Sequence, residues 1–119
     1  MSKYVVVWVD SEQAHVFHVH PEKFDESTIW TPVHRVHKHP ESGHAQPDDE
    51  KRFFQEILTA LAGAVEILVV GPSTAKLELI RYASKRDAEL EARIVGVESV
   101  AHPNDAQLVS YARTYFSEV

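Results

Sequence analysis

Residues 65–70 (VEILVV) constrain the fold more than any other part of this chain, because five of these six residues are apolar. A strand that is apolar on both of its faces must be covered on both sides, which is typical of a parallel sheet flanked by helices. Tyr4–Val9 is a comparable β-branched and aromatic run, and residues 94–97 form another short apolar strand. These three segments predict an α/β fold.

The N-terminal third of the chain predicts an antiparallel meander. Residues 14–20 alternate well enough to form a second strand, and residues 10–13 provide the turn that joins it to the first. Residues 21–26 predict a second turn, and residues 28–36 a third strand. Pro32 places this third strand at an edge of the sheet, because proline lacks the N–H that a central strand donates.

Three helices are predicted after residue 46. The first starts at residues 47–50, where a proline and three acids suit a helix N-terminus, and ends at Gly63. Its apolar face contains Phe53, Phe54, Ile57, Leu58 and Leu61. A second helix is predicted over residues 74–89. The third begins at a capping box of Asn104 and Gln107, and its apolar stripe is Leu108, Tyr111, Ala112 and Tyr115.

The resulting order is β-β-β-α-β-α-β-α. Right-handed crossovers place the fourth and fifth strands beside the first, and the meander occupies the other edge. The predicted fold is a ribonuclease H-like, five-stranded mixed sheet of order 3-2-1-4-5 with helices on both faces. The chain of 119 residues is long enough to form one domain, residues 1–119, with its own core.

Composition limits the chemistry of the chain. The absence of cysteine excludes disulfides, a thiolate nucleophile and cysteine-based metal sites. The first apolar run is too short for a signal peptide or a membrane span, so we expect a cytoplasmic protein with no membrane partner. A net charge of −6 argues against general nucleic-acid binding but leaves room for local basic clusters. Residues 34–39 form one such cluster, and Lys76, Arg81, Lys85, Arg86 and Arg93 supply another.

Residues 34–50 (HRVHKHPESGHAQPDDE) form a long polar segment, and compact domains usually keep such a loop for a function. Its histidines change charge near neutral pH. His18 and His20 share one face of the second strand, as do His37 and His39 if the third strand extends that far. These four are candidate metal ligands. The alternative, which we favour, is a solvated sheet edge, and we expect no cofactor. His15, on the opposite face, is expected to be partly buried.

Two catalytic alternatives can be considered from the residues. A two-metal nuclease requires converging carboxylates, for which Asp10, Glu56 and Asp105 are the candidates. The strand at residues 65–70, however, ends without an acid, and Asp10 also suits a turn. Ser73 follows a strand but lacks the G-x-S-x-G pattern of a nucleophile elbow, so Ser73 or Thr74 is expected to cap a helix.

A diffuse pattern over nearly the whole length resembles the middle domain of the eukaryotic and archaeal type of peptide chain release factor, including Pelota-type rescue proteins and small bacterial translational-machinery-like proteins. The pattern includes Asp10 at the end of the first strand, Ala14 and Phe17 in the second, and Phe53-Phe54 on the first helix. It continues with residues 67–72 followed by Lys76 and Leu79, and then with residues 94–97 before the last helix.

The resemblance implies a role for the polar loop. In the release factors, this loop carries Gly-Gly-Gln, which enters the ribosomal peptidyl-transferase centre and helps water attack peptidyl-tRNA. The matching positions here are His44, Ala45 and Gln46, preceded by Gly43. Gln46 is thus the candidate catalytic residue, but the two glycines are replaced, which reduces the backbone freedom of the loop.

The resemblance therefore implies a non-catalytic, single-domain binding protein associated with the ribosome or tRNA. The residues expected to contact nucleic acid are Arg35, His37, Lys38, His39, Gly43, His44 and Gln46, with Arg35 and Lys38 meeting phosphate. Two alternatives stay open. One is a hydrolase using Gln46 or a metal-dependent nuclease using Asp10. The other is an interaction module in which the edge of the third strand pairs in a homodimer.

Overall fold

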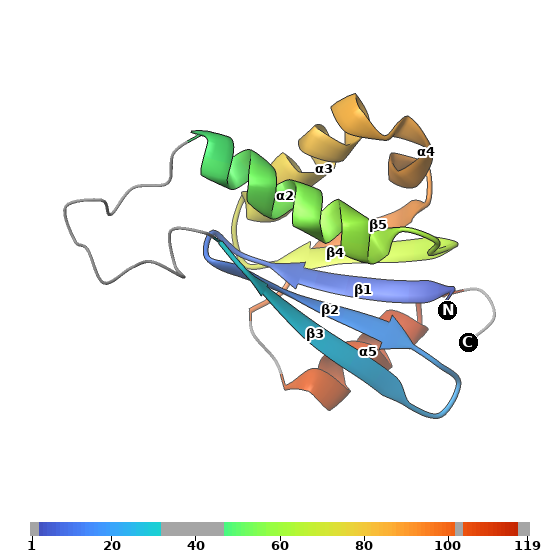
Figure 1. Cartoon of the computed structure of the whole chain (residues 1–119). Coiled ribbons are helices and arrows are strands. Elements are labelled where there is room, and N and C mark those ends of the chain that lie inside the picture. Colours follow the sequence, from blue (N-terminus) through green and yellow to red (C-terminus); the bar gives the residue numbers. More distant parts are fainter. Residues whose placement is uncertain (1–2, 32–46, 102–103, 117–119) are drawn as a thin grey trace.

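The computed structural model describes residues 3–31, 47–101 and 104–116, and within them a single five-stranded sheet has helices on both faces (Figure 1). The elements, in chain order, are β1 (Tyr4–Val9), β2 (Gln13–Val19), β3 (Phe24–Trp30), α2 (Pro47–Leu61), β4 (Glu66–Gly71), α3 (Ala75–Arg86), α4 (Ala88–Glu91), β5 (Ile94–Ser99) and α5 (Asp105–Arg113).

The strand order is β3-β2-β1-β4-β5, which confirms the predicted arrangement. β1 pairs antiparallel with β2 and parallel with β4, and β5 extends the parallel part of the sheet. Helices α2, α3 and α4 cover one face, and α5 covers the other (Figure 1).

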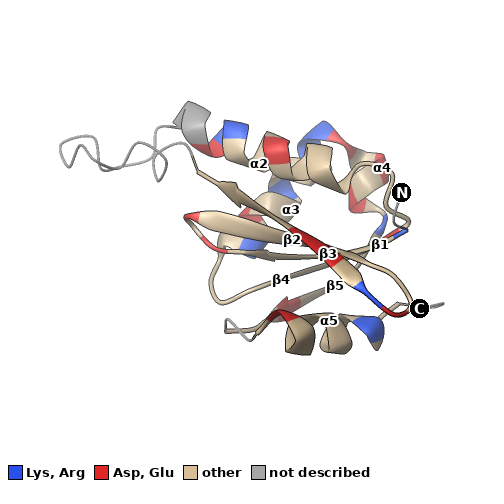
Figure 2. Ribbon diagram, turned by 60° about the horizontal axis from the view of Figure 1, so that its bottom comes forward, with Lys and Arg blue, Asp and Glu red and all other residues tan. Residues whose placement is uncertain are grey.

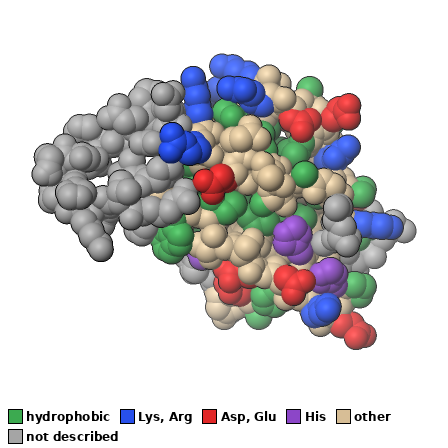
Figure 3. Space-filling view, viewed as in Figure 1, with side chains coloured by type: hydrophobic (Ala, Val, Ile, Leu, Met, Phe, Trp, Pro, Cys, Tyr) green, Lys and Arg blue, Asp and Glu red, His purple; other side chains and the backbone are tan. Residues whose placement is uncertain are grey.

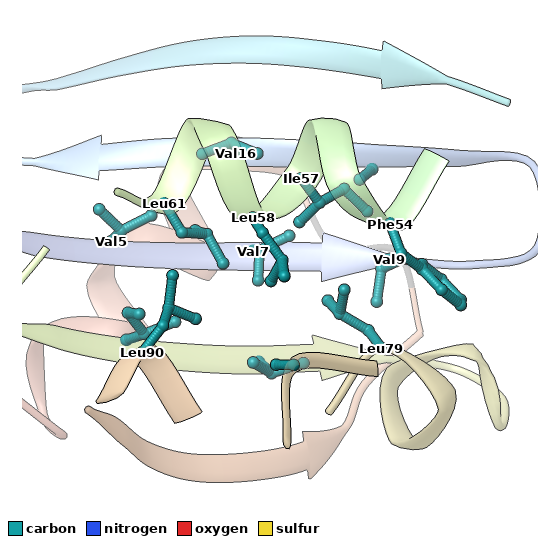
Figure 4. Packing of buried hydrophobic residues seen from close by; sticks show 14 of the residues in the cluster. Val5, Val7, Val9, Val16, Phe54, Ile57, Leu58, Leu61, Leu79 and Leu90 are labelled. Atoms are coloured by element: carbon teal, nitrogen blue, oxygen red, sulfur yellow. The ribbon is translucent and has the colours of Figure 1, made fainter. Parts of the chain in front are cut away.

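The central strand β1 is buried at all six positions, and it divides its side chains between two cores. Val5, Val7 and Val9 pack towards α2 and α3, together with Ile57, Leu61 and Leu79 (Figure 4). The alternate residues Tyr4, Val6 and Trp8 pack towards α5, against Leu108, Val109 and Ala112. Because neighbouring residues of a strand point to opposite faces, a strand between two cores has to be apolar throughout.

The predicted third strand is placed too late in the chain. It starts at Phe24 rather than at residue 28, because the turn before it is short and is closed by a hydrogen bond from His20 N to Lys23 O (2.9 Å). This register sets Phe24 opposite Val19 and its ring 5.9 Å from that of Phe17. The strand ends at Trp30, and residues 32–36 of the predicted strand lie outside the described residues.

Two helix predictions also need correction. The helix predicted over residues 74–89 is broken at Asp87, whose backbone leaves the helical region and whose side chain accepts from Leu90 N to start α4. In α5, Tyr111 is exposed, and Val109 takes its place in the core. The predicted capping box of Asn104 and Gln107 is confirmed, as is the end of α2 near Gly63, which has a positive φ of 88°.

No helix within the described ranges is long and apolar enough to cross a membrane.

Candidate functional site

The residues expected to contact nucleic acid, Arg35, His37, Lys38, His39, Gly43, His44 and Gln46, all fall in residues 32–46, outside the described part of the chain. The positions at which this segment joins the fold are described. Thr31 precedes the segment, and Glu50 is in the first turn of α2 after it. Both residues line the same small hollow of about 50 Å³, together with Ser11, Phe53, Phe54, Ala75 and Glu78. The segment therefore leaves and re-enters the fold beside one hollow.

The described histidines do not form a metal site. His18 lies opposite Asp25, next to the β2–β3 turn, and His20 pairs with Asp25 (Nε2 to Oδ2, 3.2 Å). His37 and His39 lie outside the described residues. Among the described residues, no three His, Cys, Asp or Glu side chains are grouped so as to hold a metal ion.

His15 lies on the opposite face of β2 from His18, as predicted. Its Nδ1 is 2.6 Å from Oε2 of Glu26, and its ring lies 5.7 Å from that of Trp8 between centroids. The side chain is 16% exposed, which confirms that His15 is a partly buried packing residue.

The carboxylates considered for a two-metal nuclease are separated by the fold. Asp10 is a turn residue, because its Oδ1 accepts from the backbone N–H groups of Glu12 (2.8 Å) and Gln13 (2.9 Å). Glu56 belongs to α2 and Asp105 to α5, which cover opposite faces of the sheet. This arrangement does not bring the three carboxylates to a shared site.

A larger hollow of about 370 Å³ lies between α2 and α3, next to the small one. We call it the α2–α3 groove. It is lined by Glu50, Lys51 and Phe54 of α2 and by Glu78, Arg81, Tyr82, Lys85 and Arg86 of α3. Glu50, Phe54 and Glu78 also line the small hollow, so the two are contiguous. The groove therefore continues to the place where residues 32–46 join the fold.

The groove carries much of the positive charge of an acidic chain. Four of the twelve Lys and Arg residues line it, whereas the whole chain has a net charge of −6. Lys and Arg side chains gather at the top of the face shown in Figure 3, near the start of α2, and Figure 2 shows basic residues on α2 and α3. A local cluster of this kind attracts anions even when the net charge is negative.

Tyr82 holds the two helices together at the floor of the groove. Its ring lies 5.7 Å from that of Phe54, and its hydroxyl donates to Oε1 of Gln55 at 3.1 Å. The guanidinium of Arg86 lies 5.5 Å from the centre of the Tyr82 ring, within the range of a cation–π interaction. These contacts fix the spacing of α2 and α3 and orient Arg86.

The sequence predicted only part of this basic cluster. Lys76 is buried, and its Nζ donates to the carbonyl oxygen of Ser73 (2.5 Å), so it supports the turn before α3. Arg93 is also used within the fold, since its Nη1 donates to Ala64 O at 3.5 Å. Lys51, which was not grouped with these residues, faces Arg81 and Lys85 across the groove. Thr74 is the N-cap of α3 but makes no capping hydrogen bond with its side chain.

The fold is that of a release-factor-like domain. Solved structures of Pelota proteins and of a translation termination factor share it over most of the described chain, which confirms the predicted resemblance at the level of the fold. The sequence matches no protein-family profile and no curated protein.

Pelota from Archaeoglobus fulgidus superposes with a TM-score of 0.68 at 14% identity, over 93% of this chain and 30% of that one. Pelota from Thermoplasma acidophilum gives 0.64 at 19% identity, over 92% and 31%. The archaeal translation termination factor, aRF1, gives 0.54 at 20% identity, over 94% and 36%. The chain thus spans about a third of the length of each of these proteins.

Proposed function

We propose that this protein is a non-catalytic binding protein that associates with the ribosome or with tRNA. The observation that carries the proposal is the shared fold, which extends over 94% of this chain in an archaeal translation termination factor. Fold alone does not define activity, so the proposal also depends on the residues next to the fold's long polar segment.

The proposed contact comprises residues 34–46 and the surface beside them. Arg35 and Lys38 would meet phosphate groups, and the histidines and Gln46 would add hydrogen bonds that position the protein. The location of the segment supports this role, since Thr31 and Glu50, on either side of it, line a hollow that opens into a basic groove. An anionic partner on the segment would therefore be close to further cations.

We propose a non-catalytic role because Gly43-His44-Ala45-Gln46 stands where the release factors have Gly-Gly-Gln. A side chain at both glycine positions restricts the backbone conformations of the loop. The competing function is a hydrolase in which Gln46 still positions water. Release of a labelled acyl group from charged tRNA distinguishes them, and we expect no release by the wild type beyond that of Gln46→Ala.

Ribosome association is tested directly by co-sedimentation of the purified protein with ribosomes at low and at high salt. We expect the protein in the pellet at low salt and a smaller fraction at high salt, because contacts to phosphate weaken as salt rises. The variant Arg35→Gln/Lys38→Gln should pellet less than the wild type. A wild-type protein that stays in the supernatant under both conditions would refute association with the ribosome.

A further inference from the structure

The four cations of the α2–α3 groove are exposed and have no acidic partner in the part of the chain that the structure describes. Lys51, Arg81, Lys85 and Arg86 are all exposed, and no ion pair joins any of them to a described carboxylate. Arg86 is held by the Tyr82 ring, an interaction that leaves its N–H donors free for an anion. The groove therefore offers four cations, one of them oriented, to a ligand with several negative charges.

The spacing of these cations matches a strand of nucleic acid. Arg81 and Lys85 are separated by four residues of α3, which corresponds to about 6 Å along the helix axis. This is close to the separation of successive phosphates along one strand. Lys51 approaches from α2 on the other side of the same groove, so a strand between the helices would meet cations from both sides.

The acidic residues of the groove favour RNA over an acidic peptide. Glu50 and Glu78 line it beside the cations, at the side of the small hollow. A carboxylate repels the phosphates of RNA as well as the side chains of an acidic peptide, but RNA also carries ribose 2′-hydroxyls that can donate a hydrogen bond to it.

We infer that the α2–α3 groove binds the sugar–phosphate backbone of single-stranded RNA without sequence preference. Arg81, Lys85, Arg86 and Lys51 contact phosphates, and Glu50 and Glu78 accept from ribose hydroxyls. The inference deepens the proposed function and rests on it, because it identifies a second RNA contact beside residues 34–46. Its test needs no ribosomes.

The test is the fluorescence anisotropy of a short labelled oligoribonucleotide of mixed sequence, titrated with full-length protein at several salt concentrations. Each phosphate contact to a single strand contributes about −0.7 to the slope of log affinity against log salt. Arg81→Glu/Lys85→Glu should weaken binding about tenfold or more and reduce the magnitude of the slope by about 1.4. The control Lys3→Glu/Lys23→Glu makes the same change in net charge outside the groove, and its affinity should stay near that of the wild type.

Two further variants separate charge from folding. Arg81→Lys/Lys85→Arg keeps both charges and should retain the affinity. Arg81→Gln/Lys85→Gln removes both charges without reversing them and should lose affinity. It replaces the charge-reversal variant as the test if that variant does not fold. Equal losses in the groove variant and the control, or no loss in either, would overturn the inference. Polyglutamate binding as tightly as RNA, with the same sensitivity to the variants, would overturn the choice of RNA.

The outcomes distinguish the inference from the proposed function. If groove variants bind the oligonucleotide as the wild type does while the wild type still pellets with ribosomes, the inference alone is wrong. If the groove variants lose oligonucleotide binding while no protein pellets with ribosomes, the ribosome proposal alone is wrong.

Discussion

Arg113, in the last turn of α5, donates a hydrogen bond from Nη2 to the carbonyl oxygen of His20 at 2.7 Å, across 93 positions of the chain. The same nitrogen lies 3.2 Å from the carbonyl oxygen of Lys23. One side chain thus satisfies two backbone acceptors of the β2–β3 turn. This contact ties the end of α5 to the edge of the sheet farthest from β5.

Replacing Arg113 by alanine should destabilise the protein by about 1–3 kcal/mol, because the partly buried carbonyl oxygen of His20 loses a charged donor. The free energy of unfolding in urea measures the loss. Lys85→Ala, a change at an exposed cation, is the control and should cost less than about 0.5 kcal/mol. Hydrogen exchange should also become faster at the turn between β2 and β3. Equal stabilities of the two variants would contradict the role assigned to Arg113.

Gly71 should not tolerate a side chain. A Cβ at this position would overlap the carbonyl oxygen of Val9 in the neighbouring strand. Because that atom belongs to a central strand, Gly71→Ala should cost about 3 kcal/mol or more.

Gly96→Ala provides the matched comparison. Its Cβ would meet the Tyr115 ring at 2.7 Å and a methyl group of Leu68 at 3.0 Å, and these side-chain atoms can shift more readily than a strand backbone. We expect a cost of about 1 kcal/mol there. Thermal unfolding of both variants tests the order, and a Gly71→Ala protein as stable as Gly96→Ala would show that the close approach of β4 to β1 is adjustable.

Asp10 should behave as a turn residue in both stability and activity assays. Asp10→Asn keeps the side-chain oxygen that accepts from Glu12 and Gln13, so stability should change little. Asp10→Ala should cost about 1 kcal/mol, because both acceptor contacts are lost. With labelled RNA and Mg²⁺, all three proteins should leave the RNA intact. If the wild type cleaves the RNA and Asp10→Asn does not, the result would support the alternative hypothesis of a metal-dependent nuclease.

The protein should lose stability at alkaline pH through Tyr115. The hydrogen bond from its hydroxyl to Glu98, with a smaller effect from Tyr111, raises the pKa of Tyr115 above its ordinary value. The folded state therefore retains this proton after the unfolded chain, with a tyrosine pKa of about 10, has lost it. The stabilisation is fully present below about pH 10 and is lost as pH rises above that value.

Unfolding at pH 8 and at pH 11 measures this effect. Tyr115→Phe should show a smaller alkaline loss than the wild type, and Glu98→Gln, which removes the charge but keeps an acceptor, should fall between the two. An alkaline loss of the same size in Tyr115→Phe and in the wild type would assign the effect to other groups.

Much of the architecture could be predicted because its signals are local. The fully apolar β1 and the largely apolar β4 indicated strands between two layers, and the face of α2 from Phe53 to Leu61 is buried as the helical spacing required. The errors are at boundaries. β3 starts at Phe24 because pairing with Val19 partly buries its ring, and this gain depends on a partner strand that the local pattern does not specify.

The candidate site was harder to predict because it combines residues from separate helices. The spacing of Arg81 and Lys85 on one helix was visible, but Lys51 joins them only through the packing of α2 on α3. Lys76 and Arg93 were grouped with these cations from the sequence, but their side chains donate hydrogen bonds to backbone carbonyl oxygens instead.

The sequence by itself determined the layers, the strand order and the release-factor-like fold, since the periodicity of apolar residues records which faces are buried. Only the tertiary structure decided which cations share a groove and where residues 32–46 join the fold. The physical reason is that the burial of each residue is reflected in whether that residue is apolar or polar. A binding surface instead depends on the distances between side chains from separate elements, and these distances are set by the packing of the elements.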